Sequence, residues 1–170
     1  GNKPCYIIQV TAITMRRDAI YFHVDASHYG NASKVLGEIP LFDKLKAQFP
    51  TLKAVANGEL CQYISLKQRV PGEARQAGLL AVSDNSVKMA VVVDDDIDVY
   101  NEREVMWAIA TRMVADEDLL IMPGVKGAHL DPVAYNESRM GRGPMTTRLV
   151  IDATKPLEKE FEIKTEPDEH

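Results

Sequence analysis

The stretch "VKMAVVVDDDIDVYNEREVMWAIATRM", Val87–Met113, decides the fold class of this chain. It opens with a valine-rich run, which is typical of a strand that is buried on both faces. From Asn101 to Met113 the apolar residues recur at helical spacing. A buried strand followed by a helix predicts one unit of an α/β fold.

The segments on either side continue this alternation. In chain order, the sequence predicts an amphipathic helix with Leu41, Phe42, Leu45 and Phe49 on one face, Pro40 near its start and Pro50 beyond its end; a hairpin around Asn57 and Gly58; a Pro71-led helix "PGEARQAGLLAV"; and the strands "DLLIMP" and "RLVIDAT". Strands that alternate with helices imply a mixed, largely parallel sheet that is covered on both faces. We therefore expect a three-layer α/β/α domain.

Both ends of the chain differ from this central part. The runs "CYIIQVTAITM" (5–15) and "AIYFHV" (19–24) predict two neighbouring strands, so a β-rich segment precedes the α/β domain. After Pro123 a long stretch rich in Gly, Pro and Arg is typical of a functional flap or an interface arm. The acidic tail, residues 158–170, is expected to be flexible.

Length and composition limit the class of protein. A chain of 170 residues that is 45% hydrophobic is long enough for one cored domain. The formal net charge of −5 argues against binding to nucleic acid. Two cysteines are too few for a disulfide framework, and no apolar run approaches the roughly 20 residues that span a bilayer. With no signal-peptide pattern after Gly1, we expect a cytoplasmic protein without a membrane span.

The aspartates that follow the valine run are candidates for a metal site. An EF-hand loop built on Asp94, Asp96 and Asp98 fails, because Val99 and Val105 stand where it needs a glycine and a glutamate. The D-x-D pattern also resembles the manganese and nucleotide-diphosphate site of A-type glycosyltransferases. A metal-dependent nucleotide-sugar or phosphate enzyme therefore stays open as an alternative.

A simpler interpretation of these aspartates is structural. The strand ends at Val93, residues 94–98 leave the sheet into water, and Asn101 with Glu104 begins the next helix like a capping box. In that helix the spacing predicts one core-facing set, namely Met106, Ile109, Ala110 and Met113.

A second candidate site lies in "SLKQRVPGEAR", where two cations precede a predicted helix. Lys67 and Arg69 stand at a strand end, and Pro71 is suited to open the helix, so free N–H groups and positive charge favour an anion or phosphate site. The alternative is that both are solvated loop charges. The histidines, which are His23, His28, His129 and His170, share no metal-ligand spacing.

The motifs of this chain, taken together, resemble one enzyme family. "IIQVTAITMRRDAIY", "SLKQRVPGEARQA", "VVVDDDIDVYNEREVMWAIATRM", "LDP" and "LVIDATKP" follow the order and approximate spacing of the C-terminal half of UbiD-type decarboxylases, the 3-octaprenyl-4-hydroxybenzoate carboxy-lyase family. The resemblance implies three parts: residues 1–25 are similar to the end of the family's split-barrel domain, residues 26–157 to its C-terminal α/β domain, and residues 158–170 form the tail.

The resemblance also implies an activity. The family catalyses reversible, non-oxidative decarboxylation of aromatic or α,β-unsaturated carboxylic acids, as in ubiquinone biosynthesis, with prenylated FMN, a divalent metal (Mn or Mg) and potassium. Its catalytic glutamates, and the asparagine, histidine and glutamate that organise the metal, lie upstream of "VTAIT". We therefore assign no catalytic and no metal-binding residue here, and expect the chain alone to be inactive and to bind no cofactor tightly.

The resemblance carries one residue over, and it implies partners. A lysine of the family's C-terminal domain reaches the cofactor phosphate; Lys67 is the match, and Arg69 is close enough to compete. The partner implied is the flavin-binding domain of the same enzyme, which is a homo-oligomer when intact. The alternative is a stand-alone subunit that assembles with a separate flavin-binding chain.

Overall fold

The computed structural model describes residues 6–20, 31–58, 61–84, 87–127, 131, 133–134, 145–158 and 160–161, with the side chains of the first helix described from Gly37 onward. The chain divides into two units, Gly1–Gly30 and Asn31–His170. We describe each unit by itself.

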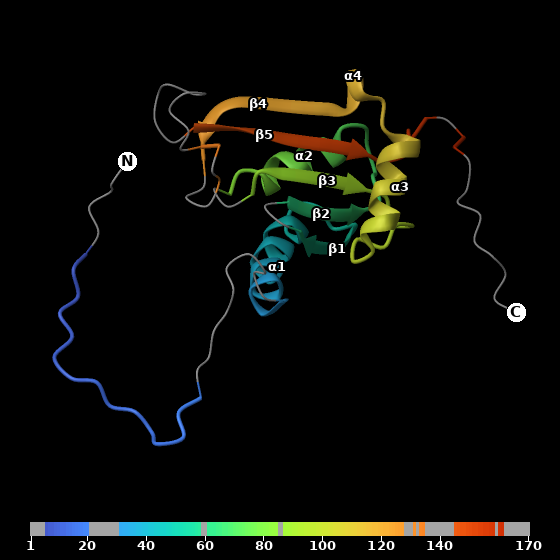
Figure 1. Ribbon diagram of the computed structural model, residues 1–170. Coiled ribbons are helices and arrows are strands. Elements are labelled where there is room, and N and C mark those ends of the chain that lie inside the picture. Colours follow the sequence, from blue (N-terminus) through green and yellow to red (C-terminus); the bar gives the residue numbers. More distant parts are fainter. Residues whose placement is uncertain are drawn as a thin grey trace, which may run out of the picture. The chain divides into compact units, whose positions relative to one another are not determined.

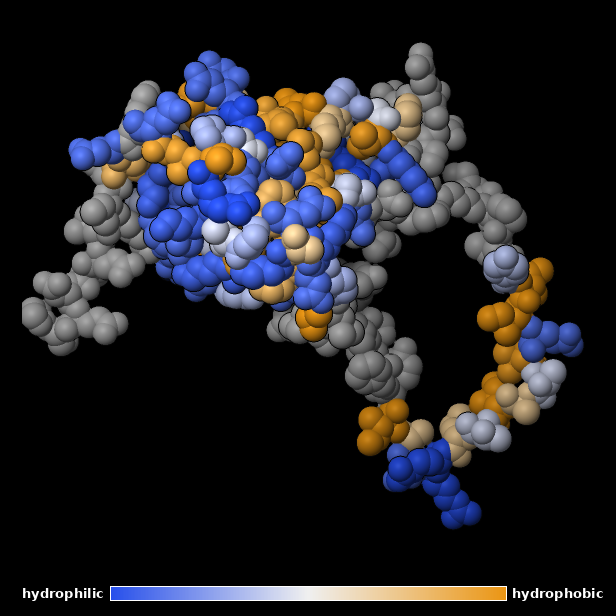
Figure 2. All heavy atoms as spheres, turned by 180° about the vertical axis from the view of Figure 1, so that it is seen from behind, coloured by the Kyte–Doolittle hydropathy of each residue, from blue (hydrophilic) through white to orange (hydrophobic). Residues whose placement is uncertain are grey.

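The described part of the first unit contains no strand. The prediction of a strand over residues 5–15 is therefore wrong for residues 6–15, and residues 19 and 20 are likewise not in a strand. A strand needs a partner for its backbone N–H and C=O groups, and here the side chains lie in solvent (Figure 2). The exposed apolar side chains are Tyr6, Ile7, Ile8, Val10, Ile13, Met15 and Ile20. The rest of the second predicted strand lies outside the described residues.

The second unit is built on one five-stranded sheet of order β1-β2-β3-β5-β4 (Figure 1). The strands are β1 (Leu52–Asn57), β2 (Cys61–Leu66), β3 (Met89–Val93), β4 (Leu119–Lys126) and β5 (Met145–Ala153). β3 pairs in parallel with β2 and β5, whereas β1 and β4 add antiparallel edges. The mixed sheet is confirmed, with its parallel pairing confined to the three central strands.

Helices cover both faces of the sheet. They are α1 (Asn31–Lys46), α2 (Glu73–Ala81), α3 (Glu102–Arg112) and the short α4 (Ala115–Asp118). One core cluster joins α1 and α2 to the sheet, and a second cluster joins α3 to the other face. Within β3, Val92 belongs to the first cluster, and Val91 and Val93 belong to the second. The valine run is therefore buried on both faces, and the three-layer α/β/α fold is confirmed.

Both early helices begin at residues other than those predicted. Pro40 lies inside α1 rather than near its start. Because Leu41 and Leu45 of this helix are buried against the sheet, packing offsets the hydrogen bond that a proline removes. α2 begins at Glu73, after Gly72 in the left-handed conformation (φ 84°). A residue with a Cβ is strained at that φ, so Gly72 rather than Pro71 sets the start of α2.

α2 lies unusually close to the sheet. A Cβ built on Gly78 would come within 2.3 Å of Val150 Cγ1, which is too close for two carbon atoms. Glycine at this position therefore lets α2 rest directly on β5, and it fixes the distance between the layers.

The predicted core face of α3 is wrong by one position. The buried residues are Val105, Ala108 and Arg112, whereas Met106 is 60% exposed. Ile109 is only partly buried. The error arises because an arginine occupies the third buried position, where an apolar side chain would be expected from the sequence.

Two further predictions are tested only in part. β4 runs through Pro123 to Lys126, with Gly124 at φ 73° where the register with β5 shifts, so the strand is longer than "DLLIMP". Most of the stretch from Gly127 to β5, and most of the acidic tail, lies outside the described residues. Among the described residues no helix has the length and apolar character needed to cross a membrane.

Candidate functional site

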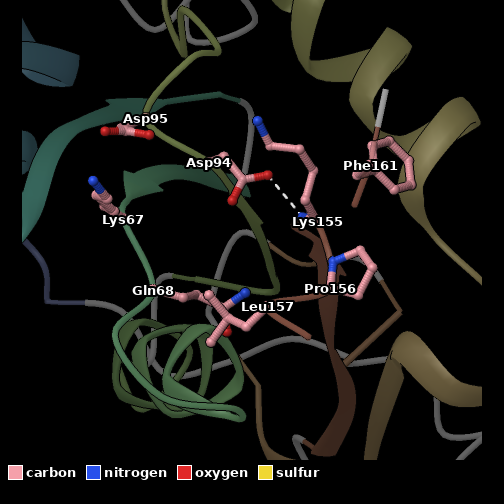
Figure 3. Close-up of a pocket in the computed structure, with 8 residues that line it drawn as sticks. All are labelled: Lys67, Gln68, Asp94, Asp95, Lys155, Pro156, Leu157 and Phe161. Atoms are coloured by element: carbon pink, nitrogen blue, oxygen red, sulfur yellow. Dashed lines mark hydrogen bonds between the residues drawn. The ribbon is translucent and has the colours of Figure 1, made fainter. Parts of the chain in front are cut away.

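The residues that follow the three parallel strands lie close together at the carboxyl-terminal ends of those strands. β2, β3 and β5 run in the same direction, so their carboxyl ends are neighbours. These ends enclose an open pocket of about 280 Å³ (Figure 3). Its lining residues are Lys67, Gln68, Asp94, Asp95, Lys155, Pro156, Leu157 and Phe161. The pocket combines an apolar wall with charged groups from three strand ends.

Lys67 follows β2 and presents an exposed side chain to this pocket. Within the described part of the chain its ammonium group has no hydrogen-bond or ion-pair partner. Its neighbour Gln68 donates a 2.6 Å hydrogen bond to Thr154 Oγ1, which ties the end of β2 to the end of β5. Lys67 is therefore a cation available to a bound anion.

Arg69, the second predicted phosphate residue, points to an intramolecular partner instead. Its Nε donates to Glu73 Oε1 at 2.9 Å, and its backbone N–H donates to Glu73 Oε2 at 2.7 Å. Burial alone would raise the pKa of Glu73, but these bonds from Arg69 outweigh it and lower the pKa. Arg69 does not line the pocket. The structure thus brings Lys67 to the pocket and pairs Arg69 with the first turn of α2.

Asp94 does not leave the sheet into water, contrary to the sequence interpretation, because it is only 8% exposed. Its Oδ2 accepts from Arg112 Nη1 at 2.8 Å and from the backbone N–H of Lys155 at 2.7 Å. Its carbonyl oxygen accepts from Ser65 Oγ at 3.1 Å. Burial raises the pKa of Asp94, and the bond from Lys155 and the charge of Arg112 offset only part of that effect. Asp94 therefore connects β2, α3 and the exit of β5.

Asp96 shares Arg112 with Asp94 and also binds the ammonium group of Lys155. Arg112 Nη2 donates to Asp96 Oδ2 at 2.8 Å, and Lys155 Nζ donates to the same oxygen at 2.9 Å. Partial burial raises the pKa of Asp96, but the bonds from Arg112 and Lys155 outweigh it and lower the pKa to about 2. The described residues contain no group of three or more His, Cys, Asp or Glu side chains placed to hold a metal ion.

The last aspartate of the cluster belongs to the start of α3. Asn101 is the N-cap, and its side chain accepts from the N–H of Arg103 at 3.2 Å, as the sequence predicts. Glu104 reaches back beyond the N-cap, because its Oε2 accepts from the N–H of Asp98 at 3.1 Å. Asp98 in turn accepts from the N–H of Tyr100 at 3.0 Å. These bonds fix the turn between the pocket and the helix.

Asp131 of the "LDP" motif lies at the amino-terminal ends of the parallel strands, away from the pocket. Asp131 is 2% exposed and accepts from Lys88 Nζ at 3.0 Å and from Thr146 Oγ1 at 2.9 Å. Lys88 precedes β3 and Thr146 lies at the start of β5, so the group is far from the carboxyl ends. Burial would raise the pKa of Asp131, but its hydrogen bonds outweigh it and lower the pKa. Asp131 therefore joins the amino-terminal ends of β3 and β5.

The sequence analysis assigned no role to two residues that lie at the pocket end of the sheet, Arg112 and Lys155. No local sequence pattern predicts that Arg112 pairs with Asp94 and Asp96, because these residues are 18 and 16 positions away in the sequence. Lys155 stands within the motif "LVIDATKP", but the sequence alone gave it no role. The helical spacing of Arg112 from Val105 and Ala108 is the one signal that would have placed it on the buried face.

The comparison with protein families identifies the family of this α/β domain. The family model of the 3-octaprenyl-4-hydroxybenzoate carboxy-lyase C-terminal domain matches residues 31–153. The chain belongs to this family. The match begins at α1 and ends at the last residue of β5, so it covers the whole sheet of this UbiD-type domain.

Relatives of this UbiD-type chain are decarboxylases. It is 32% identical over 161 residues to the anhydromevalonate phosphate decarboxylase of Methanothermobacter thermautotrophicus, covering 89% of this chain and 36% of that protein. It is 37% identical over 129 residues to the phenolic acid decarboxylase of Escherichia coli O157:H7, covering 70% of this chain and 25% of that protein. The chain thus spans about a third or less of the length of these relatives.

Solved structures agree with this family membership. The UbiD-class enzyme HmfF from Pelotomaculum thermopropionicum, in complex with FMN, matches with a TM-score of 0.67 and 32% identity over 76% of this chain and 30% of that chain. The open form of the vanillic acid decarboxylase VdcCD from Sedimentibacter hydroxybenzoicus matches with a TM-score of 0.68 and 28% identity over 79% of this chain and 30% of that chain. The predicted family and its α/β fold are confirmed.

Proposed function

We propose that this chain is the C-terminal domain of a UbiD-class enzyme that reversibly and non-oxidatively decarboxylates aromatic or α,β-unsaturated carboxylic acids. The observation that carries the proposal is the pocket at the carboxyl ends of β2, β3 and β5, in which Lys67 offers an unpaired cation within the described part of the chain. Family membership and relatives that are named decarboxylases support it.

The residues of the pocket fit one part of the implied cofactor, its phosphate group. Lys67 suits this contact because a flexible ammonium binds a phosphate oxygen as a point charge. Asp94 and Asp96 are neutralised by Arg112 and Lys155, so they repel an anion less than free carboxylates would. When bound, prenylated FMN would supply the electron-accepting group for loss of carbon dioxide.

We further propose that the remaining parts of the active site come from a flavin-binding domain, either in the same polypeptide or in a separate chain. That domain would provide the proton donor and the ligands of the divalent metal and potassium. On this proposal the isolated chain has no decarboxylase activity, and the intact enzyme is a cytoplasmic homo-oligomer. A nucleotide-sugar or phosphate site on Asp94, Asp96 and Asp98 is disfavoured, since Arg112 and Lys155 already bond Asp94 Oδ2 and both oxygens of Asp96, and Asp98 accepts from the N–H of Tyr100.

The test compares this chain alone with the intact enzyme. Decarboxylation of aromatic acids is assayed with prenylated FMN present, and cofactor affinity is measured by flavin fluorescence. The chain alone should be inactive. In the intact enzyme Lys67→Ala should weaken cofactor binding about tenfold, the value of one charge-assisted hydrogen bond.

The matched control is Lys126→Ala, because Lys126 is an exposed lysine that pairs with Met145 at the opposite edge of the sheet. It should leave cofactor affinity unchanged. Activity of the isolated chain would refute the need for a flavin-binding domain. If Lys67→Ala keeps wild-type cofactor affinity and Arg69→Ala loses affinity, then Arg69 rather than Lys67 contacts the phosphate.

A further inference from the structure

A buried arginine joins the strand ends behind the pocket. The side chain of Arg112, in the last turn of α3, is 0% exposed. Its Nη1 donates to Asp94 Oδ2 at 2.8 Å and to Asp96 Oδ1 at 2.9 Å, and its Nη2 donates to Asp96 Oδ2 at 2.8 Å. The guanidinium also lies 5.2 Å from the ring centre of Trp107. The planar guanidinium group of Arg112 therefore holds both carboxylates that follow β3 in place.

Both of these carboxylates hold the same pocket residue. Asp94 Oδ2 accepts from the backbone N–H of Lys155 at 2.7 Å, and Asp96 Oδ2 accepts from its Nζ at 2.9 Å. Figure 3 shows the bond between Asp94 and Lys155, with Lys67 on the other side of Asp94 in that view. The backbone and the ammonium group of Lys155 are thus both placed by side chains that Arg112 holds.

The charges of this group balance. Asp94 and Asp96 carry two negative charges, and Arg112 and Lys155 carry two positive charges. Without Arg112 the same group would have one excess negative charge beside the pocket. An anion bound at Lys67 would then meet a repulsive wall.

We propose that Arg112 is a positioning residue for the pocket. Through Asp94 and Asp96 it fixes Lys155, and it offsets the negative charge of these two carboxylates, so that Asp95 alone adds a further carboxylate to the lining and the pocket repels an anion less. Arg112 is not a lining residue, so it acts without touching that anion. The identity of the anion as a phosphate rests on the proposed function, whereas the placement of Lys155 does not.

A purely structural role is the rival explanation, because the loss of any buried arginine destabilises a fold. Arg148 provides the matched control, since it is 5% exposed and its guanidinium donates to the carbonyl groups of Val82 and Lys126. Arg148→Gln removes a buried guanidinium that does not contact Asp94, Asp96 or Lys155. It should weaken the whole unit without a selective effect on Lys155.

The deciding measurement is amide hydrogen exchange by NMR on this chain, with Lys155 compared with Val91 in the central strand. In Arg112→Gln the Lys155 amide should exchange about tenfold faster relative to Val91, because its charged acceptor is no longer held. Arg148→Gln should leave this ratio unchanged. Arg112→Lys should lie between wild type and Arg112→Gln, and it decides the question if Arg112→Gln does not fold. An unchanged ratio in the Arg112 variants would overturn the proposal.

A titration with inorganic phosphate separates this inference from the proposed function. Phosphate should perturb the amide signals of Lys67 and Lys155, with about threefold weaker affinity in Arg112→Gln and wild-type affinity in Arg148→Gln. No response in the wild-type chain would count against the phosphate contact of Lys67, while the exchange ratio still decides the placement of Lys155. Wild-type phosphate affinity in Arg112→Gln would overturn the effect of Arg112 on the pocket.

Discussion

Asp96 and Asp152 lie at the same edge of the sheet, and their pKa values shift in opposite directions. Asp96 is held by two cations, which outweigh its burial and lower its pKa to about 2. Asp152 is 8% exposed, and burial raises its pKa. The hydrogen bond from the N–H of Thr154 and the ion pair with Arg75 at 3.6 Å offset only part of this. The balance between burial, which raises the pKa, and hydrogen bonds and nearby cations, which lower it, therefore decides the sign of each shift.

The two carboxylates should contribute oppositely to stability. A lowered folded-state pKa adds stability that is present above the unfolded value of about 3.9 and is lost as the pH falls toward 2. Asp96→Asn should therefore lower the free energy of unfolding at pH 7 by about 1 kcal/mol, a modest loss because water screens this group. The difference from wild type should disappear as the pH falls through the folded-state pKa of Asp96.

For Asp152 the contribution of the ionised carboxylate to the free energy of unfolding has the opposite sign. A raised folded-state pKa means that ionisation opposes folding above that pKa, and the effect vanishes below about 3.9. Asp152→Asn should therefore not lower the free energy of unfolding at pH 7. Urea denaturation of both variants between pH 3 and 7 tests the pair, and equal losses at pH 7 would contradict the opposite assignments.

At the scale of elements, α3 shows how one charged residue sets the orientation of a helix. Arg112 lies on the same face as Val105 and Ala108, and all three are buried. Its two aspartate partners sit at the exit of β3, beneath that face. The ion pairs and the apolar contacts favour the same rotation of the helix, which leaves Met106 in solvent.

This orientation predicts a contrast between neighbouring positions. Val105→Ala should lower the free energy of unfolding by about 2 kcal/mol, because it leaves a cavity beneath α3. Met106→Ala should change it by less than about 0.5 kcal/mol, since that side chain is 60% exposed. Chemical denaturation of both variants is the measurement. A larger loss in Met106→Ala would restore the face predicted from the sequence.

At the scale of the whole molecule, the two units differ in how they use apolar residues. In the second unit the apolar residues form two clusters around the sheet. In the described part of the first unit, Ile7 is 97% exposed and Ile20 is 92% exposed. Apolar, strand-forming sequence without a partner invites association with another chain or domain.

Removal of residues 1–30 should therefore separate folding from association. The free energy of unfolding of residues 31–170 should stay within about 0.5 kcal/mol of the whole chain, since the two units are distinct compact units. Self-association, measured by sedimentation velocity over a range of concentrations, should decrease. A large loss of stability in the shortened chain would show that the first unit is part of the fold.

The sequence by itself determined the order of the elements in the second unit. The valine run of β3, the hairpin at Asn57 and the Asn101 cap of α3 were all predicted, because each depends on contacts between residues close in the chain. The motif set also predicted the family, which residues 31–153 confirm. The phosphate role of Lys67 stays a prediction.

Only the tertiary structure decided which charges are paired and which are free. Arg69 bonds Glu73 whereas Lys67 faces the pocket, and Asp94 is buried with Arg112 rather than exposed. Arg69 and Glu73 are four residues apart and pair locally. The pairing of Asp94 with Arg112, in contrast, depends on which side chains meet when strands and helices far apart in the sequence pack together. Local patterns carry no information about such partners, since the free energy of a buried charge depends on the groups that surround it.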